Sequence, residues 1–345
     1  MSKEKLLGKN PEELKEAAIA AGLPAFTGKQ LAQWMYVRRV KSFDEMTNIS
    51  KAGREKLSQM YDLGVSAPLG SICSTDGTKK YLFGVCGNGT AKVEAVEAVM
   101  IPDDDRKTLC VSSQAGCRMG CRFCMTGRQG WHGNLDVAEI LNQFISVDES
   151  LELTNTVFMG MGEPLDNYPN VMKAIEVLTA DWGFAWSPKR ITLSTIGVMP
   201  ALHDYLESSR CHLAVSLHNP FPEERVEMMP MQKAFDEKAI VSMIKEYDFT
   251  GQRRVSFEYT MFDGWNDDKR HADALIRLLR GLECRVNLIR FHKIPDFPYE
   301  CSPAHRMEAF RDRLNSNGIT CTIRSSRGED ILAACGMLAG KHEKE

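Results

Sequence analysis

The sequence predicts an α/β protein with three parts: an N-terminal helical region, a small antiparallel β element, and a core shaped as an open, partial barrel of six β–α units. From about residue 105 onward, short apolar runs alternate with amphipathic stretches, which is typical of parallel strands joined by helices. Two β-rich runs with a turn signal between them precede this core. The first sixty residues carry helix-start and helix-stop signals instead.

The helical region is predicted over residues 1–60. Asn10 is placed to cap a helix, Pro11 occupies its first position, and Glu13 completes a capping-box pattern. Ser50 can open a further helix a few turns later. We therefore expect a compact helical accessory domain at this end of the chain.

The antiparallel β element is predicted over residues 61–104. Strand-like runs at 78–85 and 92–99 flank a turn rich in Gly and Asn at 86–89. Such a pair of strands needs only a short connection, so a hairpin is expected.

The core is predicted over residues 105–345. Six strands are expected at 109–112, 156–159, 190–195, 212–217, 254–259 and 286–291, and a late seventh strand at 320–324. Helices are expected between them, for example at 137–146, 170–179 and 271–279. Six units are too few for a closed eight-stranded barrel, and a ligand site is expected at the C-terminal ends of the strands.

Composition limits the classes of protein. The 345 residues are 43% hydrophobic and 26% charged, with a net charge of −3, which argues against a globally basic nucleic-acid binder but leaves room for a local basic face. No apolar run reaches the length of a membrane span, and the N-terminal lysines are not followed by an apolar stretch. We expect a cytoplasmic protein without membrane contact, acting as a monomer.

The eleven cysteines are an odd number, which in a reducing compartment favours metal binding or catalysis. Cys117, Cys121 and Cys124 lie within eight residues, directly after the first core strand. Thiolates suit zinc or iron–sulfur clusters. Three cysteines on a four-iron cluster leave one iron open for a ligand. The alternative is structural zinc, which needs a fourth ligand such as Cys110 or His132.

The C-x3-C-x2-C spacing resembles that of the radical S-adenosylmethionine (SAM) superfamily. In that superfamily the open iron of a 4Fe-4S cluster binds the amino and carboxylate groups of SAM, and an electron from the cluster releases a 5′-deoxyadenosyl radical. Further motifs resemble the RlmN/Cfr family of RNA methyltransferases, in family order: 108–117, 159–164, 191–195, 213–218 and 333–336. The helical stretch around residues 30–34 is similar to the family's accessory RNA-binding domain.

The resemblance implies a set of SAM-binding residues: Gly162, Glu163, Ser194, Ser216, Leu217, His218 and His292. Several of them end predicted strands, where polar groups face the expected ligand mouth. Read without the resemblance, the glycine-rich run could be a turn only, and the serines could be strand-end caps. At His292 the family commonly has an asparagine; histidine can also donate or accept a hydrogen bond.

Carbon 2 of adenine is not nucleophilic, so it cannot attack the methyl group of a sulfonium as in a polar methyl transfer. Radical chemistry avoids this difficulty. The resemblance implies that Cys335 first accepts a methyl group, that the resulting carbon radical adds to the adenine, and that Cys110 then resolves the protein–RNA adduct by forming a disulfide. It makes Glu97 a proton acceptor. From the residues alone, both cysteines would pass as small buried side chains, and Glu97 as a solvent-facing strand carboxylate.

The implied substrates are 23S rRNA and tRNA, methylated at adenine carbon 2, with an electron donor such as flavodoxin or ferredoxin. Carbon-8 methylation is the alternative within the family, and a non-catalytic, zinc-stabilised RNA-binding module is the alternative outside it. Basic residues that could contact phosphates cluster in the helical region, with two aromatic residues among them: Lys29, Arg38, Arg39, Lys41, Trp34 and Tyr36.

Overall fold

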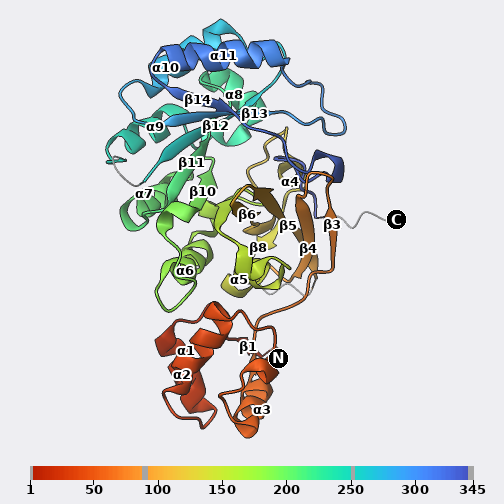
Figure 1. Cartoon of the computed structure of the whole chain (residues 1–345). Coiled ribbons are helices and arrows are strands. Elements are labelled where there is room, and N and C mark those ends of the chain that lie inside the picture. Colours follow the sequence, from red (N-terminus) through yellow and green to blue (C-terminus); the bar gives the residue numbers. More distant parts are fainter. Residues whose placement is uncertain (1–2, 88–91, 250–252, 341–345) are drawn as a thin grey trace.

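A computed structural model of the chain describes residues 3–87, 92–249 and 253–340. In Figure 1 the helical region lies at one end of the molecule and the C-terminal helices lie at the other, with the large sheet between them. No helix in this described part is long and apolar enough to cross a membrane.

Three helices form most of the N-terminal region: α1 (Pro11–Ala20), α2 (Thr27–Ala32) and α3 (Lys51–Met60). The predicted start of α1 is confirmed. The Asn10 side chain accepts from the backbone N–H groups of Glu12 and Glu13, and the Glu13 carboxylate accepts from the Asn10 N–H at 2.6 Å. Short parallel strands, β1 (Glu4–Lys5) and β2 (Tyr61–Asp62), close the region where the chain leaves it.

Among the described residues, ten strands form one sheet in the order β14-β13-β12-β11-β10-β9-β6-β5-β4-β3. The parallel strands are β6 (Arg106–Cys110), β9 (Asn155–Phe158), β10 (Ile191–Thr195), β11 (His212–Ser216), β12 (Val255–Met261), β13 (Arg285–Arg290) and β14 (Thr320–Ile323). Each of these overlaps a predicted strand. They follow one another in chain order, and the described part shows no pairing that closes the sheet, so the open barrel is confirmed.

The antiparallel strands are β3 (Gly70–Cys73), β4 (Lys79–Val85) and β5 (Glu94–Asp103). They do not stand apart from the core, because β5 pairs with β6 through a tight hairpin and thereby extends the main sheet. The expected turn at 86–89 falls partly on residues 88–91, which lie outside the described part.

The remaining helices are α4 (Met125–Arg128), α5 (Val137–Ser146), α6 (Tyr168–Thr179), α7 (Met199–Ser208), α8 (Pro222–Met228), α9 (Glu237–Lys245), α10 (Lys269–Leu279) and α11 (Ala304–Ser316). Strand residues alternate between the helices and the barrel interior. On β12, for example, Phe257 and Tyr259 are fully buried in the hydrophobic core, while Glu258 and Thr260 face a cavity inside the barrel. This alternation brings polar side chains to the site.

A hairpin that the sequence did not predict holds the cysteine loop. Strands β7 (Gln114–Gly116) and β8 (Trp131–Asn134) pair on either side of it. Gly116 has a φ of +69°, and a Cβ atom there would lie 1.9 Å from the carbonyl oxygen of Gly130, which accepts the Cys117 N–H at 2.8 Å. The hairpin therefore requires glycine at position 116.

Gly116→Ala is expected to lower the thermal unfolding midpoint of the protein more than Gly130→Ala. Both positions have positive φ, which costs about 1–2 kcal/mol for a residue with a Cβ atom. At Gly130 nothing lies within 4 Å of the added atom, whereas at Gly116 the backbone itself must move. Calorimetry of the two variants would measure the difference; equal midpoints would contradict the steric argument.

Candidate active site

A cavity opens at the C-terminal ends of the parallel strands, where the sequence predicted a ligand site. Its volume is about 170 Å³, with further space open to solvent at its mouth. Nine of the sequence-predicted site residues line it together: Cys117, Cys121, Cys124, Gly162, Glu163, Ser194, Ser216, His218 and Cys335. Residues more than 200 positions apart in the sequence thus share one space.

The three clustered cysteines line one side of this cavity. Burial raises the pKa of each thiol, to about 12 for Cys121, so a bound metal would be needed to hold them as thiolates. The cavity lining does not include Cys110 or His132, the fourth ligands that a zinc site would need. In the described part, no three His, Cys, Asp or Glu side chains are grouped to hold a single ion. Three soft donors that line one cavity fit an iron–sulfur group, which binds through cysteine thiolates.

Glu163 lies at the floor of the cavity, after β9. Its two carboxylate oxygens accept the N–H groups of Leu165 at 3.1 Å and Ile196 at 2.9 Å, and burial raises its pKa to about 7. Gly162 has a φ of +97°, and a Cβ atom there would lie 2.5 Å from the Cβ of Gln114. The glycine thus lets this turn pack against the hairpin that holds the cysteine loop.

His218 follows β11 and has a left-handed backbone, with a φ of 57°. Its Nδ1 accepts the Thr260 N–H at 2.9 Å, and burial lowers its pKa to about 3. The neutral ring therefore carries its proton on Nε2, which makes that atom a hydrogen-bond donor. The ring also packs edge-on against Phe123 of the cysteine loop, with centroids 4.9 Å apart.

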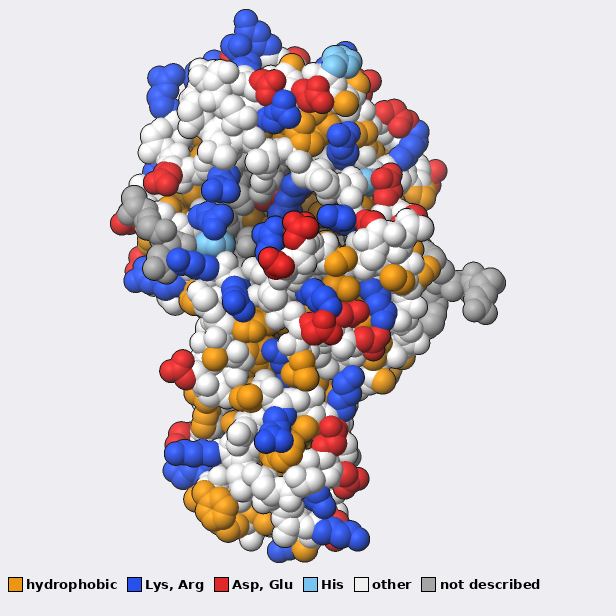
Figure 2. Space-filling model, viewed as in Figure 1, with side chains coloured by type: hydrophobic (Ala, Val, Ile, Leu, Met, Phe, Trp, Pro, Cys, Tyr) orange, Lys and Arg blue, Asp and Glu red, His pale blue; other side chains and the backbone are white. Residues whose placement is uncertain are grey.

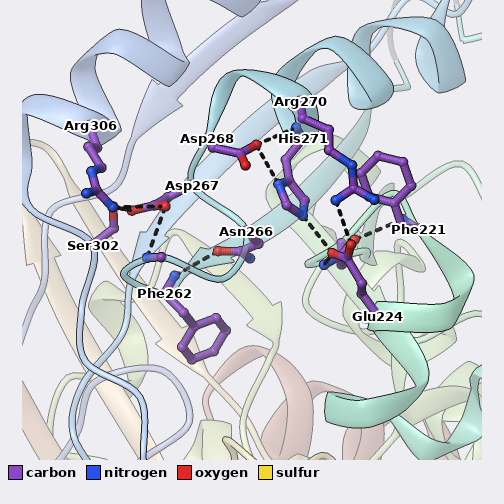
Figure 3. Close-up of polar contacts among 12 residues, drawn as sticks. Phe221, Glu224, Phe262, Asn266, Asp267, Asp268, Arg270, His271, Ser302 and Arg306 are labelled. Carbon is purple, nitrogen blue, oxygen red and sulfur yellow. Dashed lines mark hydrogen bonds and ion pairs between the residues drawn. The ribbon is translucent and has the colours of Figure 1, made fainter.

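A polar network fixes the loops after β12 (Figure 3). His271 lies between Asp268 and Glu224, at 2.7 Å from each. Asn266 accepts the Phe262 N–H at 2.8 Å. Its amide also donates to the His218 carbonyl at 2.7 Å. The strained turn at His218 is thus held by side chains from the neighbouring loop.

Arg225 is a structural residue of the site that the sequence did not reveal. It is completely buried; its Nε donates to the Leu217 carbonyl at 2.9 Å and its Nη2 to the Ser216 carbonyl at 3.0 Å. It holds the strand end that carries the predicted SAM-binding run. Arg225 lies among charged residues in α8, so the sequence did not indicate that its side chain is buried. Leu217 itself is buried and is not among the residues lining the cavity.

Cys110 and Cys335 are both close to Arg324. Cys335 lines the cavity, whereas Cys110 is buried at the end of β6. Burial and, to a smaller extent, the neighbouring Cys335 raise the pKa of Cys110 to about 12, although the Met159 backbone and Arg324 lower it. Cys335 is exposed, so the alternative of a buried side chain is wrong for it. Desolvation by the residues around it still raises its pKa, and Arg324 lowers it. Arg324 is thus the cation that both thiols share.

Hydrogen bonds fasten the segment that carries Cys335 at both of its ends. Before the cysteine, Asp76 accepts the Gly328 N–H at 3.0 Å, and Asp330 accepts from Ser74 at 2.6 Å. After it, Thr126 donates to the Leu338 carbonyl at 2.7 Å. In Figure 1 this dark-blue segment lies beside β3, β4 and β5.

Glu97 lies on β5 beneath this segment and is only 3% exposed, so the solvent-facing alternative is wrong. Its carboxylate is 3.3 Å from the Lys80 amine and accepts the Ala339 N–H at 2.9 Å. Glu97 is thus a buried carboxylate that is paired with a lysine and bonded to the backbone of the chain that follows Cys335.

The basic cluster of the helical region differs from the prediction. Trp34 and Tyr36 are buried, so they do not present faces to a nucleic acid. Arg38 stacks over Trp34 at 4.4 Å, and Arg39 over Phe184 of the core at 4.2 Å. Figure 2 shows Lys and Arg side chains spread over this face of the molecule, with acidic side chains among them.

Comparison with known proteins identifies the class and then the family. Residues 111–275 match the radical SAM superfamily, and residues 4–63 match the N-terminal domain of ribosomal RNA large subunit methyltransferases. A crystal structure of a radical SAM methyltransferase from Sphaerobacter thermophilus superimposes with a TM-score of 0.92 at 35% identity, over 98% of this chain and all of that one. The protein is a radical SAM enzyme.

Its relatives define the family more narrowly. A probable dual-specificity RNA methyltransferase RlmN from Porphyromonas gingivalis is 62% identical, over 97% of this chain and 96% of the relative. The protein of the same description from Bacteroides fragilis is 53% identical over 100% of this chain and 99% of its own length. The dual-specificity RNA methyltransferase RlmN from Syntrophus aciditrophicus is 39% identical over 97% and 96%. The chain belongs to the RlmN family of radical SAM RNA methyltransferases.

Proposed function

We propose that this enzyme methylates carbon 2 of an adenine in 23S rRNA and in tRNA, in the cytoplasm, through a methylated cysteine and a covalent protein–RNA adduct. The observation that carries the proposal is one cavity lined by Cys117, Cys121, Cys124, Glu163 and Cys335. The relatives named for dual-specificity RNA methylation, similar over nearly the whole chain, support it.

In this proposal Cys117, Cys121 and Cys124 hold a 4Fe-4S cluster. When bound, the cluster supplies the electron that splits SAM into methionine and a 5′-deoxyadenosyl radical. Glu163 would accept hydrogen bonds from the ammonium group of SAM. Ser194, Ser216 and His218 line the same cavity and would contact the rest of that molecule. Leu217, whose carbonyl accepts from Arg225, directly follows Ser216 but does not itself line the cavity.

Cys335 takes the methyl group in the first step. Its thiolate attacks the methyl carbon of one SAM molecule, the sulfonium–methyl bond breaks, and S-adenosylhomocysteine leaves. The proximity of Arg324, which opposes the desolvation effect on the thiol pKa, favours the thiolate. A radical from a second SAM then removes a hydrogen atom from this methyl group, and the carbon radical adds to the adenine.

Cys110 and Glu97 complete the reaction. The adduct radical would return one electron to the oxidised cluster, and Glu97 accepts the proton displaced from the adenine carbon. The thiolate of Cys110 then attacks the sulfur of Cys335 and forms a disulfide while the carbon–sulfur bond breaks. The released carbon takes up a proton to complete the new methyl group, and methylated RNA leaves. Arg324 lies near both thiols, and the Glu97 carboxylate touches the backbone of the same segment.

The other parts of the proposal concern the partners. A flavodoxin or ferredoxin would deliver the electrons, the enzyme would act as a monomer, and residues 1–60 would form an RNA-binding accessory domain before the element at 61–104 and the core at 105–345. The surface residues Lys29 and Lys41 of the helical region remain available for phosphate contacts.

Mass spectrometry of nucleosides tests the proposed function. Expression of the protein in cells that lack the modification should produce 2-methyladenosine in both 23S rRNA and tRNA. Finding 8-methyladenosine instead would establish the alternative within the family, and finding neither would overturn the proposal. A Cys335→Ala variant expressed at the same level is the matched control and should give no methylated nucleoside.

His292 is the proposed SAM-binding residue with the weakest geometric support. It is buried, its ring lies 3.1 Å from Ser326 and 3.3 Å from Glu329, and it is not among the residues that line the cavity. If it binds SAM, His292→Ala should weaken binding by about 10-fold, the usual cost of one hydrogen bond. Isothermal titration of the cluster-loaded protein measures this. An unchanged dissociation constant would remove His292 from the site and leave it as a support of the Cys335 segment.

A further inference from the structure

Glu258 is a buried carboxylate with one unused oxygen. It lies on β12, faces the cavity and is 3% exposed. Its Oε1 accepts from the Ser256 hydroxyl at 3.0 Å and from the Asn287 amide at 2.8 Å. Its Oε2 is buried and has no hydrogen-bond partner in the structure. An unsatisfied oxygen of this kind normally costs folding free energy, which indicates a ligand that completes it.

The surroundings of Glu258 fix the direction of the carboxylate. Asn287 is itself held by the Thr322 hydroxyl at 3.0 Å, so a chain of hydrogen bonds across three strands ends at Oε1. On the other side Arg324 Nη1 lies 4.0 Å from Oε2, too far for a hydrogen bond but close enough to offset part of the cost of a buried charge. The carboxylate raises the pKa of Arg324. Oε2 is therefore positioned as an acceptor.

We propose that Oε2 of Glu258 accepts hydrogen bonds from the ribose hydroxyls of SAM, a role that rests on the proposed function. SAM offers three kinds of donor: its ammonium group, its ribose hydroxyls and its adenine amino group. Strand β12 is the third neighbour of β9, roughly 14 Å away along the sheet, so the ammonium group at Glu163 does not reach Glu258.

The ribose is favoured over the adenine amino group by the position of Cys335. The 5′ carbon, which belongs to the ribose, must reach the methyl group on Cys335. Glu258 and Cys335 line the same cavity, and Arg324 is a charged neighbour of both. A carboxylate is also the group that proteins use to bind the ribose hydroxyls of dinucleotides. Glu258 would thus orient the ribose so that its 5′ carbon faces the cysteine.

The test measures equilibrium binding to the cluster-loaded, unreduced protein. The probes are S-adenosylhomocysteine, which has no methyl group to transfer, and its 2′,3′-dideoxyribose analogue. The unsubstituted protein should bind the hydroxylated ligand about 10- to 100-fold more tightly, the expected value of hydrogen bonds to a charged group. In Glu258→Gln, Asn287 can still hold the side-chain amide, but the preference should be lost. This variant should bind both ligands with similar affinities, weaker than the affinity of the unsubstituted protein for the hydroxylated ligand.

Ser256→Ala is the matched control, because it removes a donor to Oε1 and leaves Oε2 unchanged. It should keep the preference for the hydroxylated ligand. The ribose assignment is overturned if Glu258→Gln still prefers the hydroxylated ligand. A variant that weakens binding of both ligands by the same factor keeps that preference and has the same meaning. If the unsubstituted protein binds neither ligand, the proposed function itself fails, which is a separate outcome. Thermal unfolding of each variant without ligand shows whether the fold is retained.

Discussion

Cys110→Ala protein purified from cells is expected to carry covalently attached RNA, whereas Cys335→Ala protein is expected to be free of it. Cys335 must accept the methyl group before any bond to RNA exists, and Cys110 acts only after the adduct has formed. Removing Cys110 therefore stops the reaction at the adduct, and removing Cys335 stops it at the start. Both variants should produce no methylated adenine above the background.

Gel mobility before and after nuclease treatment, together with intact-protein mass, measures the attached RNA. Cys321→Ala is a suitable control, because Cys321 is buried on β14 outside the cavity lining and should leave methylation in place. The reverse pattern, with RNA on Cys335→Ala and none on Cys110→Ala, would exchange the two roles. Methylation by both variants would refute the two-cysteine mechanism.

Replacing any one of Cys117, Cys121 or Cys124 by alanine is expected to abolish cluster binding and SAM cleavage together. The cavity lining contains no further cysteine apart from Cys335, so the loss of one ligand leaves too few thiolates for a stable four-iron cluster. After anaerobic reconstitution, the iron content and the visible absorption of each variant should fall to a small fraction of the unsubstituted protein's values.

Cys73→Ala provides the comparison for reconstitution, since Cys73 is exposed on the edge strand β3. It should take up iron like the unsubstituted protein. A triple variant at positions 117, 121 and 124 that retained a full cluster would refute the assignment of the ligands. SAM cleavage is measured separately, as release of 5′-deoxyadenosine after chemical reduction.

The alternation of apolar strands with helical stretches was enough to predict the parallel sheet and its open form, because each strand is followed by a helix that covers it. The relation of the antiparallel strands to the core was not predictable in the same way. The predicted boundary at residue 104 falls on a two-residue turn, and Asp103 pairs with Arg106 across it. A local turn signal does not reveal whether the strands on either side of it belong to one sheet.

Some residues of the site could be predicted from the sequence and others could not. Motif residues such as Cys117 and Ser216 could be placed from the sequence because each motif is contiguous. Arg225, Glu258 and Lys80 could not, since their importance comes from partners on distant elements and from burial that their residue types do not suggest. The buried state of Glu97 was missed for the same reason, as its cover is the chain near Ala339, 242 positions away.

The fastening of the Cys335 segment has a consequence for the speed of the reaction. Only nine residues, 329–337, lie between the bonded residues Gly328 and Leu338, so the Cys335 thiol samples a small volume around the cavity. Folding has therefore already restricted the Cys335 thiol, so little further entropy is lost when it meets a reaction partner. The thiol thus has a high effective concentration near its partners. The strands β3 to β5 thereby restrict the movement of this segment. Lengthening the segment by a few glycines should slow methyl transfer to Cys335 while leaving the barrel intact.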